Sequence, residues 1–123
     1  MVAMKPENLA KLRNKQLKAT KKCSEEIDIS LIEYLNLMHN ASEDATEPMQ
    51  CFMECFYKKL NLMKDGEIQK EVIIKEKKKK LGKATATSIV EDCMADLPDN
   101  NDCAKAYKFH YCLNLALSEK SGN

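Results

Sequence analysis

Apolar residues recur at helical spacing near the start of the chain. From Leu9 to Cys23, the positions of one stripe follow each other at intervals of three and four residues. This places Cys23 on the inward side of a helix that begins near Pro6, a residue suited to a first helical turn. Ser30 and Glu33 then form a capping box, which predicts a second, short helix after residue 30.

Helical patterns continue through the middle of the chain, with turn residues between them. A polar loop over residues 39–46 leads into a third helix that begins at Pro48. A turn is expected at residues 65–66, which read Asp-Gly. The fourth helix is predicted from about residue 68 to residue 81, and Gly82 occupies its C-terminal capping position.

Two further helices are predicted in the last third of the chain. Ser88 and Glu91 form a second capping box, which opens a fifth helix, and the Leu-Pro-Asp sequence at residues 97–99 ends it. Asp102 caps the last helix, which ends near Ser118 and carries apolar residues nearly all round, as a buried helix does. The pattern therefore predicts an all-α domain of six helices.

Six cysteines are the most informative residues of the chain: Cys23, Cys51, Cys55, Cys93, Cys103 and Cys112. An even number in so short a chain indicates a disulfide framework in a secreted domain, with all fifteen pairings open. Cys51 and Cys55 share one helical face, whereas Cys103 and Cys112 point in opposite directions from theirs. A helix that is tied on both sides is expected in the middle of the fold.

Length and charge narrow the class of protein further. The 123 residues suffice for one domain, and a net charge of +1 argues against nucleic acid as a partner although 32% of the residues are charged. No apolar stretch is long enough to span a membrane, and residues 1–4 lack the apolar region of a signal peptide. We interpret the chain as a secreted, mature protein with an added start methionine; a reduced, cytosolic protein is the alternative.

Charged residues are grouped in blocks along the chain. Residues 1–22 carry seven Lys or Arg, and residues 24–47 carry seven acidic residues without a basic one. The run from Lys75 to Lys80 reads K-E-K-K-K-K. We interpret it as a solvated helix face, with attraction to an anionic membrane or receptor surface as the alternative. Asn40 begins a weak glycosylation motif in the predicted loop.

Catalytic motifs are missing from the sequence, so we do not expect an enzyme or a cofactor. The histidines are His39 and His110, and disulfide pairing would remove every thiol nucleophile. A metal site from Cys51, Cys103 and His110 together with Cys55 is a less favoured alternative, because C-x3-C is not the usual zinc-binding spacing. A pH response through either histidine stays open.

The cysteine spacing resembles that of the insect odorant-binding proteins, an all-helical family that includes pheromone carriers. The resemblance rests on the order of the cysteines and on the two short intervals, C-x3-C and C-x8-C. It implies an apolar cavity enclosed by the six helices. It also implies three interlocked disulfides, Cys23–Cys55, Cys51–Cys103 and Cys93–Cys112.

The resemblance also implies where a ligand would bind. Met53, Phe56 and Tyr57 on the C-x3-C helix and Leu113 after the final cysteine match positions that line the family's pocket. Tyrosine hydroxyls could orient a ligand oxygen, although plain core packing is the alternative for any single residue. Weaker candidates follow from helical phase or from a tyrosine hydroxyl: Leu9, Leu12, Leu35, Leu60, Val72, Ile73, Ile89, Tyr107, Tyr111 and Leu115.

The function implied is that of a secreted carrier that binds small hydrophobic semiochemicals reversibly. Its expected partners are that ligand and a membrane receptor, and the chain is expected as a monomer or weak homodimer without membrane insertion. Only eleven residues follow Cys112, and residues 118–123 are polar, so a C-terminal tail that refolds into the pocket is not expected. The alternatives are a carrier of lipids or hormones outside olfaction, and a protein acting on membranes or proteins through its lysines.

Overall fold

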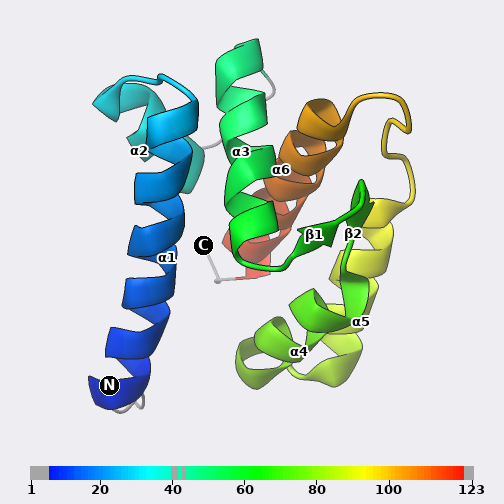
Figure 1. Ribbon diagram of the computed structural model, residues 1–123. Coiled ribbons are helices and arrows are strands. Elements are labelled where there is room, and N and C mark those ends of the chain that lie inside the picture. The colour runs from blue at the N-terminus through cyan, green and yellow to red at the C-terminus, as the bar shows by residue number, and fades with distance from the viewer. Residues whose placement is uncertain (1–5, 40–41, 43, 121–123) are drawn as a thin grey trace.

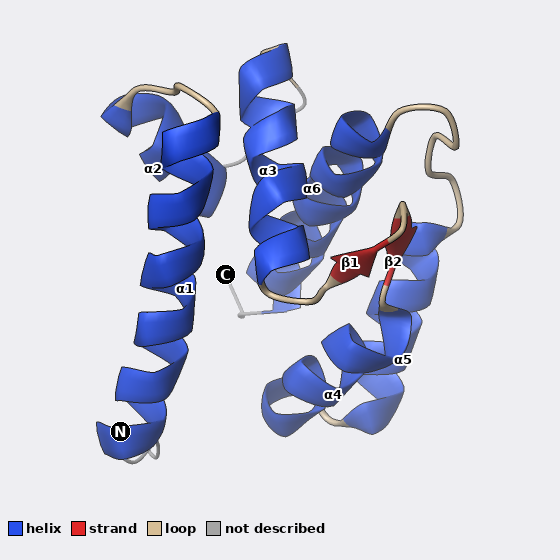
Figure 2. Ribbon diagram, viewed as in Figure 1, coloured by secondary structure: helices blue, strands red, loops and turns tan. Residues whose placement is uncertain are grey.

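The chain folds into six helices and one small hairpin (Figures 1 and 2). The computed structural model describes residues 6–39, 42 and 44–120, without the side chains of residues 6–13, 119 and 120. The predicted all-α class is confirmed, since β structure in these residues is limited to β1 (Met63–Lys64) and β2 (Glu67–Ile68). The helices are α1 (Pro6–Glu26), α2 (Leu31–His39), α3 (Glu47–Lys59), α4 (Lys70–Leu81), α5 (Lys83–Met94) and α6 (Asp102–Lys120).

The first predicted capping box is present at the start of α2. The backbone N–H of Glu33 donates to Ser30 Oγ at 3.1 Å, and the backbone N–H of Ser30 donates to Glu33 Oε1 at 2.8 Å. Two donors that the first helical turn leaves unpaired are thereby satisfied. This local sequence alone accounts for where α2 begins.

Helix α3 begins one residue before the predicted position. Thr46 is its N-cap, with Oγ1 accepting from the N–H of Met49 at 3.4 Å, and Pro48 lies within the first turn. The first turn also carries Glu47, whose negative charge suits a helix N-terminus. The loop before α3 is held by α6, because the N–H of Ser42 donates to the Tyr107 hydroxyl at 3.1 Å.

The predicted start of the fourth helix at Ile68 is wrong, because Ile68 belongs to the hairpin. Met63 pairs with Ile68 in antiparallel register, and both side chains are buried. Asp65 and Gly66 form the predicted turn, each with a positive φ angle. The ammonium of Lys105, itself buried, donates to the Gly66 carbonyl at 2.8 Å. Tertiary contacts to the core therefore favour a hairpin over another helical turn.

Gly82 ends α4, as predicted, and at the same residue opens α5. Its φ of 85° and ψ of 155° lie in a region that is essentially restricted to glycine. Helix α5 begins directly afterwards at Lys83, so Ser88 lies in the middle of the helix and is exposed. The second predicted capping box is therefore wrong, because the backbone reversal at Gly82 starts this helix without a side-chain cap.

Helix α6 is capped by the residue before the predicted one. The N–H of Ala104 donates to Asn101 Oδ1 at 2.9 Å, whereas Asp102 is the first residue of the helix. The helix continues to Lys120, two residues beyond the predicted end. Asn and Asp are both good N-caps, and only the backbone path decides which side chain faces the free N–H groups.

Helix α6 lies between α3 and α5, as the cysteine positions predict. It packs along α3, while α4 and α5 pack against each other on one side and α1 lies against α3 on the other (Figure 1). Both sides of α6 are held covalently, by Cys103 and by Cys112. The disulfides are Cys23–Cys55, Cys51–Cys103 and Cys93–Cys112, the set that the resemblance implies.

Candidate functional site

The predicted ligand residues fall into three groups by burial. Those that the structure buries come from α3, α4, α5 and α6 and belong to one continuous core: Met53, Phe56, Tyr57, Ile73, Ile89, Tyr107 and Leu113. Leu60 and Tyr111 are half-buried at its margin. Leu35, Val72 and Leu115 are exposed by 44%, 41% and 50% of their surface. The side chains of Leu9 and Leu12 lie outside the described residues.

A polar cluster lies within this apolar interior, where α3 meets α6. The Tyr57 hydroxyl is 3.3 Å from His110 Nδ1, and His110 Nε2 is 2.8 Å from the carbonyl oxygen of Leu37. Because a carbonyl only accepts, Nε2 carries the proton and Nδ1 accepts from the Tyr57 hydroxyl. The amide of Asn114, one turn further along α6, lies 3.1 Å from Nε2.

Burial changes the acid–base behaviour of both rings in this cluster. Desolvation lowers the pKa of His110, against the opposing effect of its hydrogen bond to the Leu37 carbonyl, and the positive charge of Lys77 lowers it further. Desolvation likewise raises the pKa of Tyr57 well above its ordinary value, with a smaller contribution from the charge of Glu76. The cluster is therefore an uncharged set of hydrogen-bonding groups at neutral pH.

Sequence reasoning missed part of this cluster. His110 was considered only as a metal ligand or as a pH-sensitive residue, and Asn114 was not singled out. The signal that was available is their spacing of four residues, which places both side chains on the same face of a helix. Their meeting with Tyr57 depends on how α3 crosses α6, which no local pattern states.

Two of the three candidate tyrosine hydroxyls are already hydrogen-bonded within the protein. The Tyr107 hydroxyl donates to the Ser42 carbonyl and accepts from the Ser42 N–H. It therefore holds the loop before α3, which is a structural role. The Tyr57 hydroxyl faces His110 in the interior, so it is the better placed of the two to exchange its partner for a ligand oxygen.

The alternative metal site is contradicted by the disulfides. Cys51, Cys55 and Cys103 are each oxidised, and the described residues contain no free cysteine. Cys51 and Cys103 do lie beside Glu54, but a disulfide sulfur lacks the thiolate that a metal needs. His110 instead makes the hydrogen bonds described above.

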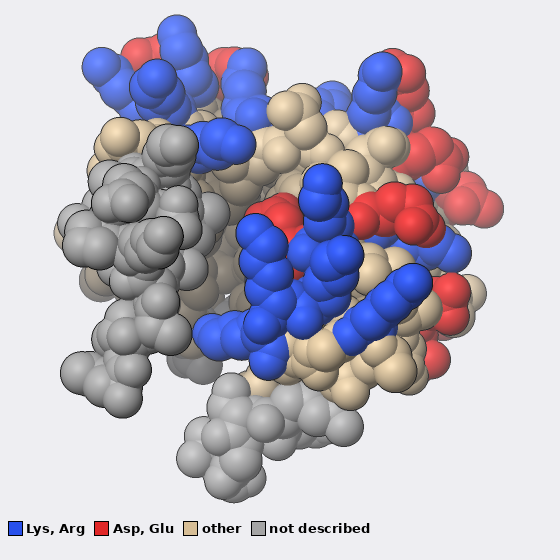
Figure 3. Space-filling model, turned by 90° about the horizontal axis from the view of Figure 1, so that it is seen from below, with Lys and Arg blue, Asp and Glu red and all other residues tan. Residues whose placement is uncertain are grey.

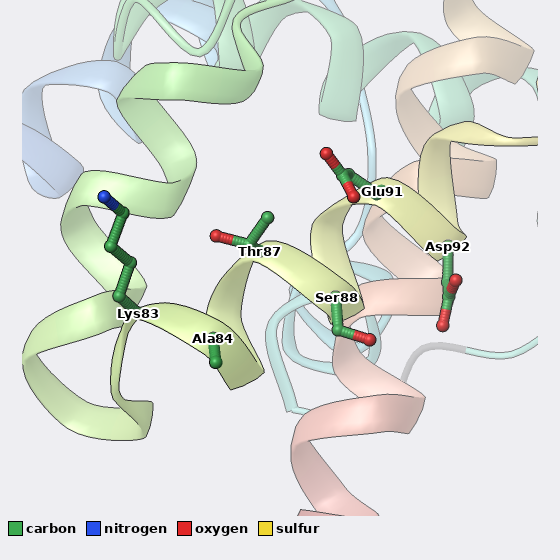
Figure 4. A pocket seen from close by; sticks show the side chains of 6 residues that line it. All are labelled: Lys83, Ala84, Thr87, Ser88, Glu91 and Asp92. Carbon is green, nitrogen blue, oxygen red and sulfur yellow. The ribbon is translucent and has the colours of Figure 1, made fainter.

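Two hollows on the surface are lined by described residues, and most of the residues that line each of them are polar. One runs along the outer side of α5, where Thr87, Ser88, Glu91 and Asp92 point outward (Figure 4). The other lies beside the hairpin, next to Lys58 and other polar residues. Of the predicted ligand residues, Val72 lines the second hollow and none lines the first. We do not place a ligand in either.

Another face of the molecule carries a group of lysines. Seen from below, Lys side chains gather over α4 (Figure 3). Among the described residues, none of the helices combines the length and the apolar character needed to cross a bilayer.

Six helices around an apolar interior, with interlocked disulfides that join α1, α3, α5 and α6, define a small, disulfide-linked helical domain. The chain belongs to the PBP/GOBP family, whose model matches residues 5–115. The predicted resemblance to the insect odorant-binding proteins is thereby confirmed. General odorant-binding protein 56a of Drosophila melanogaster is 28% identical over 90 residues, which cover 73% of this chain and 64% of the relative's length.

Solved structures of the same fold extend the comparison over almost the whole chain. The fatty acid binding protein OBP56a from the oral disk of the blowfly Phormia regina superposes with a TM-score of 0.71, covering 97% of this chain and 99% of the other. Apis mellifera odorant binding protein 5 gives a TM-score of 0.74, covering 97% of each chain. Both are 22% identical to this chain, so they establish the fold alone.

Proposed function

We propose that this protein is a secreted carrier, without catalytic activity, that reversibly binds small hydrophobic molecules between its helices. The observation that carries the proposal is membership of the PBP/GOBP family over residues 5–115. The apolar interior between α3, α4, α5 and α6 supports it, because transfer of apolar surface out of water supplies the binding energy. The three disulfides support secretion, since such bonds persist outside the cytosol.

The ligand's apolar part would contact Met53, Phe56, Ile73, Ile89 and Leu113. Burial of apolar surface contributes about 25 cal/mol per Å² before the costs of ordering. A micromolar affinity corresponds to about −8 kcal/mol, which a ligand of roughly ten to twenty heavy atoms reaches at ordinary efficiency.

One polar group of the ligand would replace a hydrogen bond in the Tyr57–His110 cluster. An alcohol, ester or aldehyde oxygen can accept from the Tyr57 hydroxyl, which then gives up its bond to His110 Nδ1. The pocket would thus fix the orientation of a ligand that is otherwise held by shape. Odorants, pheromones and lipids all meet this requirement, and the fatty-acid-binding title of one structural neighbour keeps lipids among the proposed ligands.

Displacement of the fluorescent probe N-phenyl-1-naphthylamine by a panel of volatile and lipid ligands tests the proposal. We expect micromolar, saturable binding to the oxidised protein and its loss after reduction of the disulfides. Leu113→Ala should weaken binding, while Leu31→Ala, at a side chain exposed by 72%, should not. A folded, oxidised protein that takes up no probe would mean that the interior is filled, and the proposal would fail.

A second candidate function is contact with membranes or protein partners through α4. Lys75, Lys78, Lys79 and Lys80 are exposed and make no ion pair among the described residues. Replacing these lysines by glutamine should abolish such contacts in vesicle co-sedimentation and leave probe binding unchanged. A membrane receptor and a monomeric or weakly dimeric state remain part of the proposal. Asn40, the glycosylation candidate, lies outside the described residues.

A further inference from the structure

Helix α4 carries a lysine on its inward stripe. Ile73 and Ile74 are buried, and Leu81 packs against the core from the last turn of the helix. A helix that keeps one face inward repeats every three or four residues, so Lys77 continues the stripe from Ile73 and Ile74 towards Leu81. Lys77 is indeed half-buried, whereas the lysines around it are exposed. An aliphatic residue would be expected at this position.

The charge of Lys77 has no acidic partner among the described residues. The ion pairs among these residues are made by other lysines, such as Lys58 and Lys59. The neighbouring Glu76 is exposed and makes no ion pair with Lys77. Because no acidic side chain offsets this charge, an anionic group of a ligand could pair with it.

Lys77 also acts on the interior of the protein. Its positive charge contributes to the lowered pKa of His110, so the charge of Lys77 acts on the polar cluster between α3 and α6. The Tyr57 hydroxyl of that cluster is a hydrogen-bond donor, and Lys77 is a cation. Both attract an anionic oxygen.

The surface around Lys77 favours the approach of anions. Lys75, Lys78, Lys79 and Lys80 are exposed on the same helix, and Figure 3 shows lysines gathered on this face. A cluster of one sign of charge raises the local concentration of the opposite sign. These lysines would draw anions towards the face, but only Lys77 lies on the inward stripe.

We propose that Lys77 receives the anionic head group of an amphipathic ligand, a long-chain carboxylate, whose hydrocarbon chain occupies the apolar interior. This inference rests on the proposed carrier function and narrows it to one class of ligand. The half-buried Lys77 side chain, which makes no ion pair among the described residues, would contact the head group, and the apolar interior would contact the hydrocarbon chain. A neutral ligand of the same chain length would use the interior but not the lysine.

Binding of laurate, methyl laurate and dodecanol to the oxidised protein at neutral pH tests this inference. The wild type should bind laurate roughly tenfold more tightly than the ester or the alcohol, the size expected for one charge-assisted contact. Lys77→Met should remove that preference and leave the affinity for methyl laurate unchanged. Lys77→Arg should keep most of it.

Lys79→Met is the matched control, because it removes one exposed lysine from the same helix. It should lower the affinity for laurate much less than Lys77→Met does. Equal affinities of laurate and methyl laurate in the wild type, or equal losses in the two variants, would overturn the inference while the carrier function stands. Failure of all three ligands to bind the folded protein would instead overturn the carrier function itself.

Discussion

The ring of Tyr57 meets the ring of His110 edge to face, with centroids 5.8 Å apart and the hydroxyl 3.3 Å from Nδ1. This contact joins α3 to α6 in the interior. Both residues are buried, and burial favours the uncharged form of each ring. Protonation of His110 would place a positive charge in this interior. Low pH should therefore weaken the packing of α3 against α6.

The stability of the folded protein should fall as the pH drops below the ordinary histidine pKa of 6.5. The pKa of His110 is lowered in the folded state, so between the two values the unfolded chain takes up a proton that the folded chain does not. The loss amounts to at most about 1.4 kcal/mol per pH unit. Urea unfolding at several pH values measures it.

Replacement of His110 isolates this effect from the titration of carboxylates. The groups around His110 are Tyr57, Tyr107, Asn114, the Leu37 carbonyl and the charge of Lys77. His110→Gln should flatten the pH dependence relative to the wild type, and His39→Gln, at an exposed position, should retain it. Identical pH profiles for the wild type and His110→Gln would contradict the prediction.

The two serines of the capping-box patterns should respond differently to alanine. Ser30→Ala removes the acceptor for the Glu33 N–H and should lower the free energy of unfolding by about 1 kcal/mol. Ser88→Ala lies inside α5, where alanine is the better helix former, and should be neutral or slightly stabilising. Thermal or urea unfolding measures both. Equal destabilisation by the two changes would contradict the assignment of α5.

Removal of a disulfide should cost more when the bond spans more of the chain. Cys51–Cys103 joins residues 52 apart and Cys93–Cys112 residues 19 apart. Loop-closure entropy in the unfolded chain gives about 4 and about 3 kcal/mol, respectively. Paired Cys→Ala variants, unfolded by denaturant, should show this order. The reverse order would mean that native-state effects outweigh chain entropy here.

Gly82→Ala should destabilise the protein through the backbone alone. A Cβ at this position would meet no heavy atom within 4 Å, so a steric clash cannot contribute. The φ and ψ angles of Gly82 are unfavourable for any residue with a Cβ, at a cost of about 1–3 kcal/mol. Lys79→Ala, three residues earlier on the exposed side of α4, is the control and should change the unfolding free energy little. Equal changes in the unfolding free energy of the two variants would contradict the prediction and would mean that the backbone at residue 82 adjusts to alanine.

Much of the fold was predictable because its signals are local. The Ser30–Glu33 capping box, the Asp65–Gly66 turn and the stop at Gly82 depend only on neighbouring residues. The error at Ile68 came where a local preference met a tertiary contact. Ile68 continues a helical pattern, yet its burial beside Met63 makes the hairpin the better solution.

The candidate site was predictable only in part. Met53, Phe56, Tyr57 and Leu113 are buried, but Leu115 is exposed, although helical phase gave it the same standing as other apolar residues of α6. Helical phase predicts which residues share a face of a helix, but it does not predict how much of that face the neighbouring helices bury. Coverage depends on the neighbouring helices and on the angles at which they cross.

The sequence by itself determined the class of this protein, because cysteine order, helical periodicity and capping residues act over short distances in the chain. Only the tertiary structure decided which side chains meet. Tyr57 and His110 are 53 residues apart, and their contact follows from the packing of α3 along α6. Lys77 looked like one of several solvated lysines until the burial of Ile73 and Ile74 showed which side of α4 faces inward. Packing geometry, which couples distant residues, is the physical reason for that division.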